Sequence, residues 1–205
     1  ILGWRPRDLN LGFLPFLKGQ GIAQYTSDPA FRAMLSQTPE ENLFGAAVQF
    51  TQVFSDPGLD WARIAKIRSW TKLPVILKGI MRADDATRTV AEGYDGILVS
   101  NHGGRQVDGG IGTMDALPGI VAAANGKIPV MLDSGIRCSA DIFKALALGA
   151  SAVGIGRPYV YGLAIGGEEG VHAVMEHLMA DLDIHMALNG CRTPAEITRA
   201  NLALP

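Results

Sequence analysis

Four short apolar runs alternate with helix-like stretches along most of this chain. The runs lie at residues 74–78, 95–100, 129–133 and 152–156, and each is bounded by glycine, proline or a charged residue. The stretches at 83–92, 114–124 and 139–148 carry apolar residues at three- and four-residue spacing, which is typical of amphipathic helices. Strand and helix in regular succession indicate βαβ units, so we predict an α/β fold with a parallel sheet.

Residues that commonly cap helices lie at the ends of these predicted helices. Asp84 or Asp85 can cap the first helix and Ser139 the third, and Gly149 follows the third helix. A longer helix predicted over 168–188 carries an apolar stripe, which is typical of the last outer helix of a barrel: Val171, Val174, Leu178, Leu182 and Met186.

Four βα units are half of a (βα)8 TIM barrel, which usually needs about 250 residues. We therefore predict that residues 58–205 are the C-terminal four βα units of such a barrel, whose N-terminal half is absent from this chain. Residues 1–57 carry helix-like pieces at 29–35 and 39–54 but no strand alternation, and we expect them to form a long active-site excursion loop. Its seven phenylalanine and tyrosine side chains could pack a lid or, equally, a subunit contact.

Composition narrows the classes of function. The chain has 205 residues, is 48% hydrophobic and 19% charged, and has a net charge of -2, which favours a globular enzyme domain and disfavours a nucleic-acid partner. We expect no membrane association, because no apolar run reaches the roughly 18 residues of a spanning helix. Cys138 and Cys191 lack metal-ligand spacing and favour a reducing, cytoplasmic location.

The segment Ser100-Asn101-His102-Gly103-Gly104-Arg105-Gln106 directly follows the second predicted strand. A single histidine after a strand is more often a hydrogen-bonded structural residue than a base. Here the other strands also end in charged or glycine-bearing loops, and such ends share one face of a parallel barrel. An imidazole that titrates near neutral pH and a guanidinium that can hold a carboxylate then suit an anionic substrate that loses a proton.

Two glycine-bearing loops follow the last two strands, Asp133-Ser134-Gly135-Ile136-Arg137 and Gly154-Ile155-Gly156-Arg157-Pro158. Barrels commonly bind phosphate at this position, through backbone N–H groups and arginine side chains. A phosphate-binding isomerase or lyase without flavin, with Lys78 as a Schiff-base lysine, would use the same loops. A noncatalytic half-barrel fragment is a further alternative.

Together with Leu77-Lys78-Gly79-Ile80 and the run from Lys144 to Ala150, these segments resemble the FMN-dependent 2-hydroxy-acid oxidase and dehydrogenase family. The likeness runs in one order from about Leu2 to Leu188. The opening Leu-Gly-Trp-Arg-Pro-Arg-Asp-Leu is most similar to the lactate 2-monooxygenase branch. So is Asp133-Ser134-Gly135, which stands where the family commonly has Asp-Gly-Gly.

The resemblance implies an FMN-dependent enzyme that oxidises an L-2-hydroxy acid, above all L-lactate, and reoxidises its flavin with oxygen. Among the site residues it implies, His102 is the base, Arg105 the substrate-carboxylate ligand and Lys78 a catalytic group beside the flavin. FMN contacts are implied for Lys78, Ser100, Asp133, Gly135, Arg137, Gly156 and Arg157, and no metal is expected. A homo-oligomer, tetramer or octamer, is implied as well. His172, His177 and His185 lie on the last predicted helix, and we interpret them as surface residues.

Overall fold

The computed structural model describes residues 14–54, 58–107 and 109–203. The chain divides into two compact units, Ile1–Lys72 and Leu73–Pro205, each of which is described by itself. The boundary between the units falls later than the division at 57/58 made from the sequence. The helix α6 (Trp61–Ser69) accordingly belongs to the first unit.

In the described part of the first unit every regular element is helical. The other helices are α2 (Leu14–Leu17), α3 (Ala23–Thr26), α4 (Pro29–Arg32) and α5 (Leu43–Val53). Both α4 and α5 are shorter than the helix-like pieces predicted from the sequence. Asp28 and Asn42 explain where α4 and α5 begin, because their side chains accept the backbone N–H groups of Phe31 and Gly45 at 2.9 and 2.8 Å.

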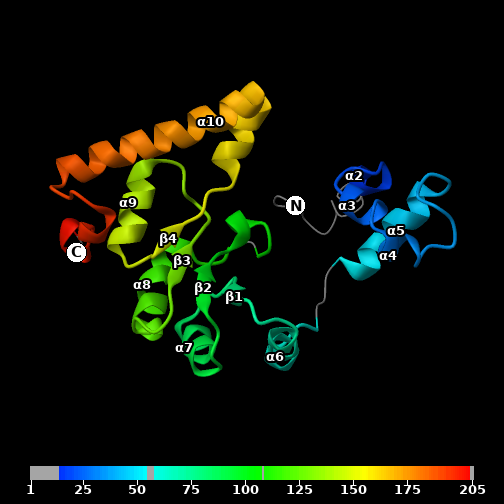
Figure 1. The fold of residues 1–205 in the computed structure, drawn as a ribbon, viewed down its shortest axis with the longest axis horizontal. Helices are drawn as coiled ribbons and strands as arrows, with labels where there is room; N and C mark the ends of the chain where they lie inside the picture. Colours follow the sequence, from blue (N-terminus) through cyan, green and yellow to red (C-terminus); the bar gives the residue numbers. More distant parts are fainter. Residues whose placement is uncertain (1–13, 55–57, 108, 204–205) are drawn as a thin grey trace. The chain divides into compact units, whose positions relative to one another are not determined.

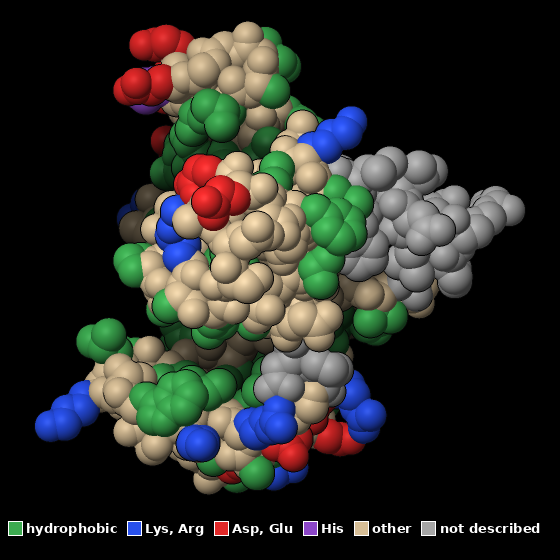
Figure 2. All heavy atoms as spheres, turned by 90° about the vertical axis from the view of Figure 1, so that its right-hand side faces the viewer, with side chains coloured by type: hydrophobic (Ala, Val, Ile, Leu, Met, Phe, Trp, Pro, Cys, Tyr) green, Lys and Arg blue, Asp and Glu red, His purple; other side chains and the backbone are tan. Residues whose placement is uncertain are grey.

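Aromatic side chains supply much of the core of the first unit. Tyr25 lies edge-on to Phe50 at a ring-centroid distance of 4.9 Å, and Phe16 and Phe54 contact the same ring at 5.3 and 4.8 Å. Buried Ile22, Phe31, Ala46 and Ala47 complete this cluster. Other hydrophobic side chains reach the surface, where they are green in Figure 2. The large exposed ones in this unit include Met34, Phe44, Leu59 and Trp70.

A parallel sheet organises the second unit. Its described strands are β1 (Ile76–Lys78), β2 (Gly96–Val99), β3 (Val130–Leu132) and β4 (Ala152–Val153), in the order β1-β2-β3-β4 (Figure 1). Adjacent strands pair in parallel, with Leu77 opposite Ile97 and Leu98 opposite Met131. The predicted βαβ succession is confirmed. The strands are shorter than the apolar runs that predicted them.

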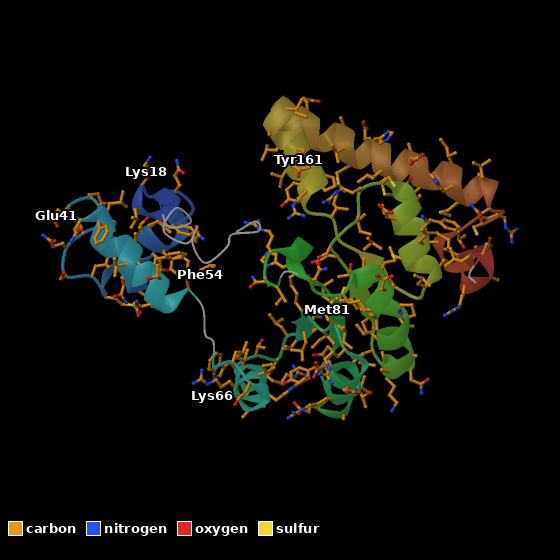
Figure 3. The ribbon with its side chains drawn as sticks, turned by 180° about the vertical axis from the view of Figure 1, so that it is seen from behind. Lys18, Glu41, Phe54, Lys66, Met81 and Tyr161 are labelled. Carbon is orange, nitrogen blue, oxygen red and sulfur yellow. The ribbon has the colours of Figure 1, made fainter. Side chains whose placement is uncertain are left out.

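The helices α7 (Ala83–Ala91), α8 (Thr113–Ala124) and α9 (Ser139–Ala147) follow β1, β2 and β3. They enclose a core in which Ile97, Val99, Leu117, Ile120 and Leu132 are almost fully buried. Met81, labelled in Figure 3, lies just after β1 and packs against this core.

Two predicted helix caps are wrong. The residue before α7 is Arg82, and Asp84 and Asp85 instead lie in the first turn of that helix. Acidic side chains are favourable there as well, because the helix dipole is positive at this end. Cys138, not Ser139, precedes α9, and the Asp141 side chain accepts the N–H groups of Arg137 and Cys138 at 2.9 and 3.2 Å.

The last long helix, α10 (Arg157–Leu188), begins earlier than the predicted start at residue 168. It contains a break at Gly166 and Gly167, where φ and ψ leave the helical region. Tyr161 lies on the part before the break (Figure 3). The part after the break packs on α9 through Leu182 and Met186, which confirms an outer helix over this stretch. Among the described residues, no helix is long and apolar enough to cross a membrane.

Candidate active site

The carboxyl ends of β1, β2 and β3 bring three predicted site residues together. Lys78 ends β1, Ser100 follows β2, and Asp133 follows β3. Lys78 Nζ donates to Ser100 Oγ at 2.9 Å and forms an ion pair with Asp133. These three side chains therefore form one connected polar group along the edge of the sheet where barrels place their active sites.

Asp133 is the carboxylate of this group, and its side chain is 22% exposed. Burial by itself would raise the pKa of Asp133. Hydrogen bonds from Lys78, Ser100 and Ser134, together with the charge of Lys78, outweigh that effect and hold the pKa below its ordinary value. Asp133 is therefore ionised at neutral pH, and its charge offsets that of Lys78.

A tight turn follows β2 and carries His102 and Arg105. Its single 3-10 turn, η2 (His102–Gly104), has left-handed backbone at all three positions, with φ values of 56°, 66° and 74°. Left-handed backbone favours glycine at Gly103, and a Cβ there would lie 3.0 Å from Arg157 Nη1. The turn leaves the side chains of His102 and Arg105 exposed, and Gln106 Nε2 lies 2.9 Å from His102 Nδ1.

A cavity of about 380 Å³ lies between this turn and the loops after β3 and β4. Its lining includes seven of the residues predicted from the sequence: His102, Arg105, Asp133, Gly135, Arg137, Gly156 and Arg157. Lys78 and Ser100 join the same group through their hydrogen bonds to each other and the ion pair with Asp133. The fold thus brings every predicted site residue to one place.

The charge around the cavity suits an anion. Arg105, Arg137 and Arg157 all line it, and among the described residues Asp133 is the one acidic side chain in the lining. Arg157 also begins α10, so the positive end of a helix dipole adds to the charge of these side chains. A phosphate beside Arg137 and Arg157, and a carboxylate beside Arg105, would each find a guanidinium there.

Sequence reasoning gave no role to several residues of the site. The sequence marks Ser134 only as a departure from a family pattern, yet Ser134 lines the cavity and its hydroxyl is hydrogen-bonded to the Gly103 N–H and to Asp133. Gln106, Ile155 and Tyr159 also contact His102 or line the cavity. Ile155 and Tyr159 flank the glycine-arginine motif after β4, which is the signal that could have identified them.

The three remaining histidines lie on α10. His172 and His177 are exposed, as predicted. The side chain of His185 is only partly exposed, and its Nδ1 lies 3.2 Å from the buried Ser139 Oγ and 2.8 Å from the Asp181 carbonyl oxygen. Across residues 14–54, 58–107 and 109–203, no three histidine, cysteine or acidic side chains are grouped so as to hold a metal ion.

Comparison with known proteins gives consistent matches. The family model described as FMN-dependent dehydrogenase matches residues 1–204. An FMN-dependent alpha-hydroxy acid dehydrogenase of Penicillium citrinum, qulF, is 49% identical over 97% of this chain and 50% of its own length. An L-lactate oxidase of Lysinibacillus sphaericus is 46% identical over 93% of this chain and 48% of its own length.

Solved structures agree in fold. A mandelate oxidase structure with (S)-4-hydroxymandelic acid superposes with a TM-score of 0.70 at 42% identity, covering 76% of this chain and 43% of that one. Mandelate and lactate oxidases are TIM barrels, so the predicted fold class is confirmed. The chain spans about half the length of the curated relatives that it matches.

Proposed function

This chain belongs to the FMN-dependent dehydrogenase family, and we propose that it supplies the catalytic half of an enzyme that oxidises L-lactate or a similar L-2-hydroxy acid. The observation that carries the proposal is the convergence of His102 and Arg105 with Arg137 and Arg157 on one cavity. A base and a carboxylate ligand then stand beside a phosphate site, as a 2-hydroxy acid and FMN together require.

The cavity fits the charged end of FMN. Arg137 and Arg157 can hold the phosphate by charge-assisted hydrogen bonds, and the N–H groups of Gly135 and Gly156 stand in the same loops. No atom lies within 4 Å of the place where a Cβ would stand on either glycine, so their backbone is open to close approach by a ligand. We assign ribityl hydroxyl contacts to Asp133.

Bound FMN would accept the electrons of the hydroxy acid and pass them to oxygen. Lys78 supplies a positive charge held by Ser100 and Asp133, and we assign it to the edge of the flavin ring that becomes negative on reduction. Asp133 offsets that charge and, with Ser100, fixes the position of the ammonium group.

His102 and Arg105 act on the substrate in this proposal. The imidazole takes a proton from the α-carbon or the hydroxyl of the acid, and the planar guanidinium holds the carboxylate with two parallel hydrogen bonds. Two residues separate them on a tight turn, so that one rigid segment carries both groups. This arrangement orients the α-carbon between the base and the cofactor.

Flavin content and the turnover product of the full-length protein test the proposal. We expect one FMN per chain, with acetate from L-lactate if the enzyme is a lactate 2-monooxygenase, or pyruvate and hydrogen peroxide if it is a lactate oxidase. Pyruvate formation only with an artificial electron acceptor would indicate a dehydrogenase. A colourless protein that leaves every 2-hydroxy acid unchanged would contradict the proposal and favour a flavin-free barrel enzyme.

A further inference from the structure

Two of the three described non-glycine residues with left-handed backbone conformation lie in the site. Among the described residues it occurs at His102 (φ 56°), Asn125 (φ 48°) and Ser134 (φ 76°). Asn125 ends α8, where such a conformation is common. His102 and Ser134 lie in neighbouring loops after β2 and β3. Non-glycine residues stay in this conformation only where the surroundings hold them, which is typical of functional sites.

The Ser134 hydroxyl makes two hydrogen bonds that join these loops. It accepts the N–H of Gly103 at 2.9 Å and donates to Asp133 Oδ1 at 2.7 Å. The backbone of Ser134 is held in turn, because Thr113 Oγ1 donates to its carbonyl oxygen at 3.0 Å. A half-buried hydroxyl thus links the turn that carries His102 to the carboxylate paired with Lys78.

The same turn is held from its other side. Arg157 Nη2 donates to the carbonyl oxygen of Gly103 at 3.0 Å. Gly103 therefore has its N–H bound by the loop after β3 and its carbonyl bound by the loop after β4. His102 precedes this residue directly and Arg105 follows two positions later, so the two contacts restrict the placement of both side chains.

We infer that Ser134 is a positioning residue, which holds the turn after β2 so that His102 and Arg105 meet the substrate in a fixed orientation. This inference rests on the proposed function. Both hydrogen bonds of this hydroxyl go to protein groups of the site, the Gly103 N–H and the Asp133 carboxylate. Through this one side chain, the turn that carries His102 and Arg105 is hydrogen-bonded to the Asp133 carboxylate, which is paired with Lys78.

Two substitutions in the full-length, FMN-loaded enzyme test the inference. Ser134→Ala removes the hydroxyl and keeps a side chain on left-handed backbone, whereas Ser134→Gly removes the hydroxyl and relieves the backbone. Glycine accepts a φ of 76° without cost, so this second variant keeps the test valid if the first fails to fold. The matched control is Ser139→Ala, which deletes another buried hydroxyl, bound to Asp181 and His185, outside the site.

The readouts are the limiting rate of anaerobic flavin reduction by L-lactate, the Kd for FMN and the thermal midpoint. We expect both Ser134 variants to reduce their flavin about 10- to 100-fold more slowly, because small displacements of catalytic groups have effects of this size. The Kd for FMN should stay within about threefold of the wild-type value, since Arg137 and Arg157 remain. The control should keep its reduction rate within about twofold.

A reduction rate within threefold of wild type in Ser134→Gly would overturn the inference. So would a loss of FMN affinity as large as the loss of rate, which would make Ser134 a cofactor ligand. Failure of the proposed function is a separate result, because the wild-type enzyme would then contain no flavin or fail to be reduced by any 2-hydroxy acid.

Discussion

His102 stands exposed at the start of the turn after β2, with Gln106 beside its Nδ1 at 2.9 Å. We predict that His102→Ala in the full-length enzyme leaves FMN bound and slows flavin reduction by about 10² to 10⁴-fold, the usual cost of losing a general base. Anaerobic stopped-flow measurement with L-lactate gives the rate. Reduction within about threefold of wild type would remove His102 from the mechanism.

The sequence predicted a place in the site for some residues and missed the role of others. Lys78, His102 and Arg105 could be predicted to lie together because Lys78 ends one apolar run and the other two come soon after another, and the ends of parallel strands share one edge. The role of Ser134 could not be predicted, because it depends on a contact with Gly103, 31 positions earlier in the chain, and on a left-handed backbone that no local pattern indicates for serine.

At the scale of elements, Gly149 sets the approach of α8 to the end of α9. A Cβ at Gly149, where φ is 103°, would lie 2.7 Å from Val121 Cγ1. Gly93 has a φ of 77° with nothing within 4 Å, which makes it a matched control. We predict that Gly93→Ala costs about 1 kcal/mol of unfolding free energy, from backbone strain alone. Gly149→Ala should cost a further ~1–3 kcal/mol from the clash.

Urea unfolding of the two variants beside the wild-type protein gives both free energies. The larger loss must belong to Gly149→Ala. Equal losses would show that the helices move apart freely enough to admit the methyl group.

In the first unit, Glu40 accepts two hydrogen bonds from Arg32, at 3.0 and 2.8 Å. These bonds, with the Glu40 backbone N–H and the charge of Arg32, lower the pKa of Glu40 to about 2. We predict that Arg32→Ala returns this pKa toward about 4.3, the value of an exposed glutamate. Because the folded-state pKa is depressed, the stabilisation is present above pH 4.3 or so and is lost as the pH falls toward about 2.

Carboxyl-carbon NMR titration of Glu40 measures this change. Glu41 is the internal control, because its pKa is lowered by hydrogen bonds from Thr38, which the substitution leaves in place. A Glu40 titration unaltered by Arg32→Ala would show that the ion pair does not form in solution.

The order of the strands and helices in the second unit could be predicted from the sequence. The residues at which some helices begin could not. Alternating apolar runs and helical periodicity identified all four described strands and α7 to α9. The predicted helix over 168–188 matches the part of α10 after the break at Gly166 and Gly167, and α10 also has a part before that break, from Arg157. The cap of α9 was misplaced by one residue, because Cys138 precedes the helix and the hydroxyl of Ser139 donates to Asp181 on α10.

At the scale of the molecule, the described sheet has two open edges, β1 and β4. Such edges favour pairing with another chain. We predict that the 205-residue chain alone binds FMN weakly and does not turn over L-lactate, because only part of a barrel surrounds the cavity. Activity should return when an N-terminal half of a relative is supplied. Flavin titration and an oxygen-electrode assay measure this, and sustained turnover by the chain alone would contradict it.

The central claim is that this chain carries the FMN and 2-hydroxy-acid site of its enzyme. Anaerobic titration of the purified full-length protein with L-lactate tests it most directly, because flavin loses its blue absorption when a bound hydroxy acid reduces it. The account predicts a yellow protein that is bleached by stoichiometric L-lactate and not by D-lactate. A protein that purifies without flavin, or whose flavin stays oxidised with every 2-hydroxy acid, would contradict it.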